Sequence, residues 1–367
     1  MISISRLLRP EKHPFPGDSL RYAKTGSPHP PVIVWHITGR CNLSCRHCYA
    51  YAAAESLPQT GFSKTDAREF LRMTAEIKPP ALLFSGGEPL CHPDFWDILY
   101  EARLVGIRTA VSTNGTLIGE SEARALAKYS SYVGISLDGP RETHDSFRGR
   151  SGAFEAALRA VELTSSEGCR TGLRVTLARP ILEHLAEFLE LAEKLRVSRI
   201  CFYHFMRSGR GVLDESLAPD GAEEDSALYR IIEWADNRAG ADGRPSPEIL
   251  TVGDAADSVR LYRYLASKYP FRARTAMKLL ARSSGKPAGA GILSVRWDGA
   301  VFRNQFSWGA PLGNWRDIAA TARRAGEKMK LARECESCGE MGTICGGRSL
   351  GFGVECRVNA TSDIRPK

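Results

Sequence analysis

Short runs of apolar and β-branched residues alternate with longer amphipathic stretches over the first two thirds of the chain. The runs predict strands at Val32–Ile37, Ala81–Phe84, Arg108–Ser112, Tyr132–Leu137, Leu173–Leu177 and Ile200–Phe205. Between them, apolar residues three and four positions apart predict helices near 64–77, 94–105, 120–129, 153–167 and 183–195. Alternating strands and helices predict right-handed βαβ units and a parallel sheet. Six strands suit a partial (β/α)6 barrel with its active site at the C-terminal strand ends, and a doubly wound sheet is the alternative.

The alternation ends after Gly211, and this change divides the chain. We expect an N-terminal extension on the outside of the fold (1–31), a β/α core (32–211), a mostly helical connecting region (212–288) and a small C-terminal domain (289–367). In the last of these, two apolar runs flank Trp297-Asp298-Gly299, which predicts a β-hairpin.

Composition limits the classes of protein that need to be considered. With 367 residues, 43% hydrophobic and 25% charged, the chain has the composition of a soluble globular protein. It has neither an apolar run long enough to span a membrane nor a secretory signal, so we expect it in the cytoplasm, with no membrane partner. The formal charge of +8 suits a polycarboxylate ligand, an acidic surface or nucleic acid. Since Lys and Arg are scattered, without an aromatic-interleaved basic stripe, we expect no nucleic-acid partner.

Three cysteines stand close together directly after the first predicted strand. Cys41, Cys45 and Cys48 are spaced to hold three irons of one iron–sulfur cluster, which leaves the fourth iron open. A structural zinc site needs a fourth ligand, and His36 or His47 could supply it, so zinc is an alternative. Disulfides fit an odd set of three poorly. Seven of the ten cysteines lie in two tight groups, which indicates metal binding in a reducing compartment.

The second group is near the C-terminus and comprises Cys335, Cys338, Cys345 and Cys356. Four cysteines can fully ligate one 4Fe–4S cluster or one zinc ion, and similar spacings occur in zinc knuckles.

Small and polar side chains follow successive predicted strands. They are Gly86, Gly87, Glu88, Ser112, Asn114, Ser136 and Asp138, with Arg174 inside the fifth strand. Two glycines allow the backbone to approach a ligand closely, and Glu88 can accept hydrogen bonds from an ammonium group. Each of these segments could instead be an ordinary turn, and an arginine on a strand is more often at the surface.

The cysteine motif, with aromatic His47 before its last Cys, resembles the signature of the radical S-adenosylmethionine (SAM) superfamily. The resemblance implies that Gly86–Glu88 binds the methionyl amino group of SAM and that the other polar residues line the cofactor site. Arg174 and Thr176 alternate along the fifth strand, and one of them is expected to pair with the SAM carboxylate. The C-terminal cysteines resemble a SPASM/twitch-like auxiliary-cluster domain. Because Asn304 stands where many relatives have a Cys, we expect one auxiliary cluster and two 4Fe–4S clusters in total.

Three further stretches, 34–41, 132–148 and 202–211, resemble the tetrapyrrole-modifying enzymes of this superfamily. That group includes didecarboxysiroheme deacetylase, the heme d1 biosynthesis protein NirJ and heme synthase. The resemblance implies a 5′-deoxyadenosyl radical that removes or shortens acetate or propionate side chains of an iron tetrapyrrole. Conversion of didecarboxysiroheme to iron-coproporphyrin fits best, and heme d1 side-chain modification is an alternative.

The same resemblance suggests substrate residues and a partner. Arg207 and Arg210 are candidates for binding substrate carboxylates through bidentate pairs. His204 is a candidate iron ligand or acid, although a packed histidine is an equally good interpretation. An electron donor such as ferredoxin or flavodoxin is expected.

Two other classes of function remain open. A SPASM-type ribosomal-peptide maturase shares the clusters, but it normally carries an added peptide-recognition domain. A non-enzymatic iron–sulfur or zinc regulator is disfavoured by Gly86–Glu88, because a sensor needs no SAM pocket. The sequence does not decide between acetate removal, propionate removal and decarboxylation.

Overall fold

One curved sheet organises the molecule. The computed structural model describes residues 1–10, 17–22, 30–50, 61–238, 247–283, 291–306, 309–324 and 345. Within them, eleven strands form one sheet in the order β1-β8-β7-β6-β5-β4-β3-β2-β9-β10-β11. The parallel strands are β2 (Val32–Thr38), β3 (Leu82–Gly86), β4 (Thr109–Thr113), β5 (Val133–Ser136), β6 (Thr171–Leu177), β7 (Arg199–His204) and β8 (Glu248–Val252). Neighbours in sequence are neighbours in space from β2 to β8, as in a barrel wound in one direction.

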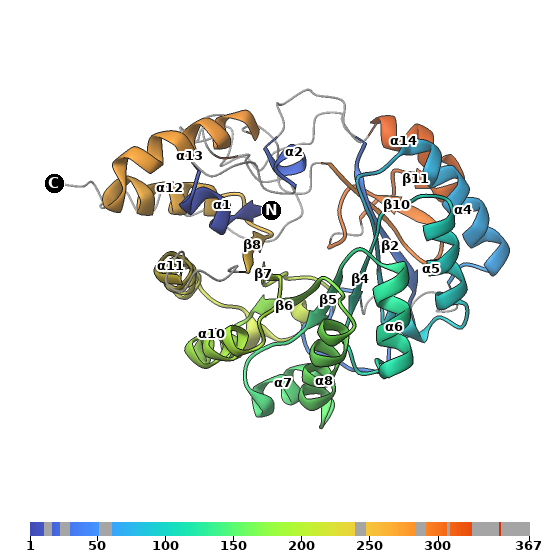
Figure 1. The fold of residues 1–367 in the computed structure, drawn as a ribbon, viewed down its shortest axis with the longest axis horizontal. Coiled ribbons are helices and arrows are strands. Elements are labelled where there is room, and N and C mark those ends of the chain that lie inside the picture. Colours follow the sequence, from blue (N-terminus) through green and yellow to red (C-terminus); the bar gives the residue numbers. More distant parts are fainter. Residues whose placement is uncertain are drawn as a thin grey trace.

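The six strands predicted from the sequence are confirmed as β2 to β7, with ends that differ by two residues at most. The predicted helices are also found, as α4 (Lys64–Ile77), α5 (Phe95–Leu104), α6 (Glu120–Tyr129), α8 (Ala153–Ser166) and α10 (Leu185–Lys194). Two short helices that were not predicted, α7 (Arg141–Arg148) and α9 (Arg179–Glu183), stand beside them. The helices cover the outer face of the curved sheet (Figure 1).

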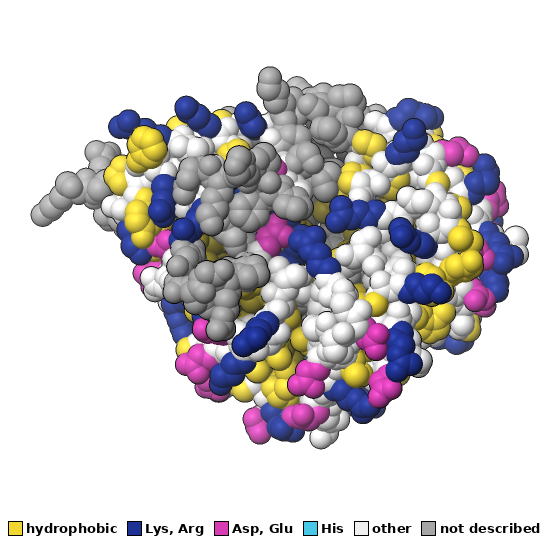
Figure 2. All heavy atoms as spheres, viewed as in Figure 1, with side chains coloured by type: hydrophobic (Ala, Val, Ile, Leu, Met, Phe, Trp, Pro, Cys, Tyr) yellow, Lys and Arg dark blue, Asp and Glu magenta, His cyan; other side chains and the backbone are white. Residues whose placement is uncertain are grey.

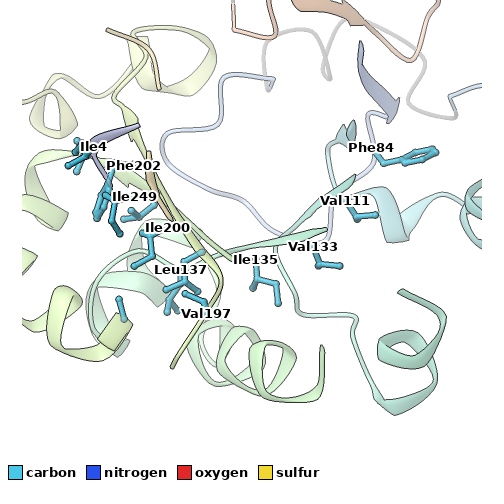
Figure 3. Close-up of a cluster of buried hydrophobic side chains, with 14 of the residues drawn as sticks. Ile4, Phe84, Val111, Val133, Ile135, Leu137, Val197, Ile200, Phe202 and Ile249 are labelled. Carbon is cyan, nitrogen blue, oxygen red and sulfur yellow. The ribbon is translucent and has the colours of Figure 1, made fainter. Parts of the chain in front are cut away.

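The core lies between this outer face and the helices. Phe84, Val111, Ile135 and Phe202 point from β3, β4, β5 and β7 to the same side of the sheet (Figure 3), and all are fully buried. Because side chains alternate along a strand, the residues between them point to the inner face of the barrel. We call the space against this inner face the lumen; the functional residues lie along it and at its C-terminal rim.

The N-terminus is part of the core. Strand β1 (Ile2–Ser3) pairs with β8, and α1 (Ile4–Leu8) buries Ile4, Leu7 and Leu8. The expectation that this segment lies on the outside is therefore wrong for residues 2–8, where apolar side chains cover the end of the barrel. A second short helix follows, α2 (Asp18–Arg21).

The connecting region is mostly helical, as expected, with one strand that was not predicted. Its helices are α11 (Gly221–Arg238), α12 (Asp257–Lys268) and α13 (Pro270–Ser283), preceded by 3-10 turns at Gly209–Val212 and Glu215–Leu217. The extra strand is β8, whose five residues are all buried. An apolar run this short does not distinguish a strand from a helix.

The predicted hairpin is confirmed as β9 (Ile292–Val295) and β10 (Ala300–Phe302), and it continues the barrel sheet because β9 pairs in parallel with β2. It is followed by β11 (Gly313–Asn314), a 3-10 turn at Trp315–Asp317 and α14 (Ile318–Arg324). The hairpin turn also contacts the end of β2, since a Cβ on Gly39 would lie 2.8 Å from the Trp297 ring.

The surface carries both signs of charge. Lys and Arg side chains are spread over the face shown in Figure 2, with Asp and Glu among them. Among the described residues, no helix is both long and apolar enough to cross a membrane.

Candidate active site

The cysteine loop Cys41–Cys48 follows β2 at the C-terminal rim and is held by the segments after β5 and β7. Gly149 has φ +69°, and a Cβ there would lie 2.6 Å from the Ser44 carbonyl oxygen. Gly209 has φ +57°, and its Cβ would lie 2.2 Å from the Cys48 carbonyl oxygen. Both positions therefore require glycine for conformation and for space.

Two arginines bring positive charge to this loop. Arg148 lies with Nη1 3.8 Å from the Cys45 sulfur. Arg210 donates from Nη1 to the Cys45 carbonyl oxygen at 2.8 Å, and its backbone N–H donates to the Cys48 carbonyl oxygen at 3.0 Å. Burial raises the pKa of the Cys41 thiol to about 12 and that of Cys48 to about 11. Thiolates here need a strong positive partner, which the irons of a cluster would supply.

Of the C-terminal cysteines, Cys345 is described and is buried. The other three, Cys335, Cys338 and Cys356, lie outside the described residues.

His47 packs against the first helix after β5. Its ring stacks on Phe147 with centroids 4.0 Å apart and planes 3° apart. Burial lowers its pKa well below the usual value, assisted by the positive charge of Arg148. The His47 ring is therefore neutral and packs as an aromatic side chain within the cysteine loop.

The Gly86–Glu88 segment continues β3 alongside the cysteine loop. The backbone N–H of Gly87 donates to the Thr38 carbonyl at 2.7 Å, and that of Glu88 donates to the Arg40 carbonyl at 2.8 Å. A Cβ on Gly87 would lie 2.2 Å from the Arg40 oxygen, so a side chain there would push the two segments apart. The glycine pair thus brings β3 against the loop that carries the cluster.

Glu88 is buried beneath this segment and links two strand ends. Its Oε1 accepts from Thr113 Oγ1 at 2.8 Å and from the Leu90 N–H at 3.2 Å, and its Oε2 accepts from the Asn114 N–H at 2.7 Å. Burial raises the pKa of Glu88 to about 7, against the opposing effect of these bonds. Asn114 in turn donates from Nδ2 to Asn42 Oδ1 at 2.9 Å, inside the cysteine loop.

Asp138 has a similar linking role on the next strands. Its Oδ1 accepts from the Thr176 N–H at 2.7 Å, and its Oδ2 accepts from Arg148 Nε at 2.7 Å. The carboxylate is fully buried and fixes Arg148 beside the cysteine loop. Arg148 received no role from the sequence, although it ends the stretch that resembles the tetrapyrrole enzymes. Ser112 and Ser136 are half-buried on the lumen side of β4 and β5.

The three predicted substrate residues lie in different surroundings. His204 is buried, with Nε2 2.9 Å from Asp257 Oδ2 and Nδ1 3.9 Å from Glu224 Oε1. Arg207 is exposed and pairs with Glu215 at 3.1 Å. Arg210 contacts the cysteine loop, as described above. The structure therefore does not gather them at one place.

His204 belongs to a buried charge network between β7, α11 and α12. Burial alone lowers its pKa, but the Asp257 carboxylate outweighs burial and raises the pKa well above the usual value. The other charged groups in this network are Glu224, Asp254, Asp225 and Arg260, together with the Met1 amino group. His204 thus acts here as a packed cation.

Comparison with known proteins identifies the family. The Radical SAM superfamily model matches residues 35–194. Fe-coproporphyrin III synthase of Methanosarcina barkeri is 38% identical over 331 residues, which cover 86% of this chain and 81% of that protein. The chain belongs to the radical SAM superfamily. Pre-heme d1 synthase of Dinoroseobacter shibae is 32% identical over 362 residues, 95% of this chain and 87% of that protein.

A solved structure agrees at the level of fold. Streptococcus suis SuiB bound to S-adenosylmethionine superposes with a TM-score of 0.61 at 17% identity, over 92% of this chain and 76% of that one. The predicted radical SAM barrel and the resemblance to tetrapyrrole-modifying enzymes are confirmed. Membership of the superfamily implies a 4Fe–4S cluster and SAM.

Proposed function

We propose that this radical SAM enzyme removes or shortens carboxylate-bearing side chains of an iron tetrapyrrole, converting didecarboxysiroheme to Fe-coproporphyrin III. The observation that carries the proposal is the similarity to Fe-coproporphyrin III synthase, which extends over 86% of this chain and 81% of that protein. This similarity extends beyond residues 35–194, which match the superfamily model. It therefore includes strands and loops that would contribute to a substrate pocket.

The residues around the cysteine loop divide the work of holding the cofactors. A 4Fe–4S cluster held by Cys41, Cys45 and Cys48 would supply the electron for reductive cleavage of SAM. Arg148, fixed by Asp138 near Cys45, is placed to pair with the SAM carboxylate. Glu88 and the carbonyl groups beside it are the acceptors for the ammonium group. Arg210 positions the loop through the Cys45 and Cys48 carbonyls.

The second cluster belongs to the same proposal. Cys335, Cys338, Cys345 and Cys356 would hold one auxiliary 4Fe–4S cluster, and the burial of Cys345 supports a site protected from water. An acidic electron donor such as ferredoxin or flavodoxin would reduce the enzyme, in keeping with the net charge of +8.

A binding titration under anaerobic conditions tests the choice of substrate. The reconstituted protein is titrated with didecarboxysiroheme, and we expect the absorption bands of the tetrapyrrole to shift at micromolar concentration. An unrelated peptide should not compete. If no iron tetrapyrrole binds in this range, the proposal is wrong and the peptide-maturase alternative takes its place.

A further inference from the structure

The lumen holds an arginine for which the fold makes space. On β6, Leu173, Val175 and Leu177 are fully buried in the core, so Arg174 and Thr176 between them face the lumen. The side chain crosses the neighbouring strand at Gly134, where a Cβ would lie 2.8 Å from Arg174 Cδ. Any other residue at 134 would displace the arginine. The absence of a side chain at Gly134 therefore leaves room for the Arg174 side chain in this position.

Arg174 has no carboxylate partner among the described residues. The guanidinium carbon lies 4.5 Å from the centroid of the Tyr203 ring, and no described side chain forms an ion pair or hydrogen bond with it. By contrast, Arg199 at the other end of the lumen is paired with Glu248 at 2.6 Å. A desolvated cation without a counter-charge is costly, and proteins keep one mainly where a ligand supplies the charge.

Aromatic rings line the space next to this arginine. Phe306, which follows β10, lies 5.2 Å from Tyr49 and 6.3 Å from Tyr203, both edge to face. The Tyr49 hydroxyl shares a hydrogen bond with Ser85, on the inner face of β3. His36, on β2, lies 6.0 Å from the Tyr49 ring. The lumen thus combines flat apolar walls with one unpaired positive charge.

The position of Arg174 separates it from the SAM end of the site. Arg148 lies with Nη1 3.8 Å from the Cys45 sulfur and Arg210 donates to the Cys45 carbonyl oxygen at 2.8 Å, whereas Arg174 lies over the Tyr203 ring at 4.5 Å. Under the proposed function SAM would bind beside the cysteine loop, so a guanidinium that pairs with its carboxylate would lie near the cysteines. Arg148 meets that requirement, which leaves Arg174 available for a different carboxylate.

We propose that Arg174 binds a carboxylate of the substrate, with Tyr49, Tyr203 and Phe306 packing against its conjugated ring system. The assignment rests on the proposed function and names a residue that determines its specificity. A planar macrocycle with carboxylate side chains matches both features: its face stacks on aromatic rings and its edge supplies the missing counter-charge. The cofactor role expected for Arg174 from the sequence is replaced by this substrate role.

The test compares free and esterified carboxylates. Wild type and R174M are titrated with Fe-coproporphyrin III and with its methyl ester, following the absorption bands. Methionine keeps the length of the side chain and removes the charge. We expect R174M to bind the free acid about 10- to 100-fold more weakly and the ester nearly as well as wild type does. R124M, which removes an exposed arginine of α6 paired with Glu120, should bind both ligands like wild type.

The thermal stability and the SAM affinity of R174M distinguish a substrate role of Arg174 from a structural role or a cofactor role. Because a half-buried charge without a carboxylate partner among the described residues is removed, R174M should unfold at the same temperature as wild type or higher. An equal loss of affinity for acid and ester, a fall in stability, or a loss of SAM affinity would each overturn the inference. If wild type binds no iron tetrapyrrole, the proposed function itself is wrong, and that result is distinct from a failure of the Arg174 assignment.

Discussion

Adding a methyl group at Gly209 should remove the cluster of the Cys41–Cys48 loop and leave the auxiliary cluster in place. In G209A the new Cβ would lie 2.2 Å from the Cys48 carbonyl oxygen and 2.6 Å from that of Tyr49. An ordinary carbon–oxygen contact is roughly 1 Å longer, so either the cysteine loop or the segment after β7 must move. Since Cys48 is a proposed cluster ligand, displacement of its carbonyl would disturb the cluster site directly.

The same substitution at Gly152 provides a matched control. Gly152 also has a positive φ, +79°, but a Cβ there meets nothing within 4 Å. G152A therefore carries only the conformational penalty of about 1–2 kcal/mol. G209A carries a similar penalty plus the steric conflict with the loop, so the difference between the two variants isolates the contact with Cys48.

Iron analysis after anaerobic reconstitution measures the outcome. Wild type and G152A should bind about eight irons per chain, and G209A about four, since the auxiliary cysteines are untouched. SAM cleavage by dithionite-reduced G209A should be lost together with the four irons. If G209A keeps full iron content and cleaves SAM at the wild-type rate, the close packing of Gly209 on the cysteine loop does not hold the cluster site.

Three further predictions concern the same rim. Replacing all three cysteines within Cys41–Cys48 by serine should abolish SAM cleavage and leave about four irons per chain, measured by iron analysis. Finding zinc instead of these four irons would contradict the auxiliary-cluster assignment. R210A should lower SAM cleavage even without substrate. R207A loses only an exposed ion pair with Glu215 and should change the free energy of unfolding by less than about 1 kcal/mol. An equal fall in SAM cleavage in the two variants would refute this distinction. The raised pKa of His204 stabilises the fold fully below the unfolded value near 6.5, and this contribution is lost as pH rises through the raised pKa. The difference in Tm between wild type and H204Q should therefore be largest at pH 6 and shrink in alkaline buffer, and a difference that grows with pH would contradict the assignment.

The barrel strands could be predicted because each is a compact apolar run followed by an amphipathic helix. Strands β1 and β8 could not, because Ile2–Ser3 is only two residues long and its partner lies at Leu250–Thr251, far along the chain. Nothing local to either segment signals that pairing. The Pro and polar residues within 1–31 predict instead an extension on the outside of the fold.

The site shows a similar division. The spacing of the cysteines and the Gly86–Glu88 segment predict the cofactor loops, because the residues concerned lie close together at strand ends. The sequence does not predict the direction in which each of these side chains points. Arg210 follows β7 as expected, yet it turns back onto the Cys45 carbonyl, and Arg148 reaches the loop only because Asp138 on another segment fixes it. Such roles depend on tertiary contacts that no spacing encodes.

Turnover of the tetrapyrrole tests the central claim most directly. The reconstituted enzyme is incubated anaerobically with SAM, dithionite and didecarboxysiroheme, and the products are analysed by mass spectrometry. We predict Fe-coproporphyrin III together with 5′-deoxyadenosine, and neither tetrapyrrole product nor substrate-stimulated SAM cleavage in the variant that lacks the cysteines of the Cys41–Cys48 loop. Formation of 5′-deoxyadenosine at the same rate with and without didecarboxysiroheme, with the tetrapyrrole recovered intact, would contradict the account.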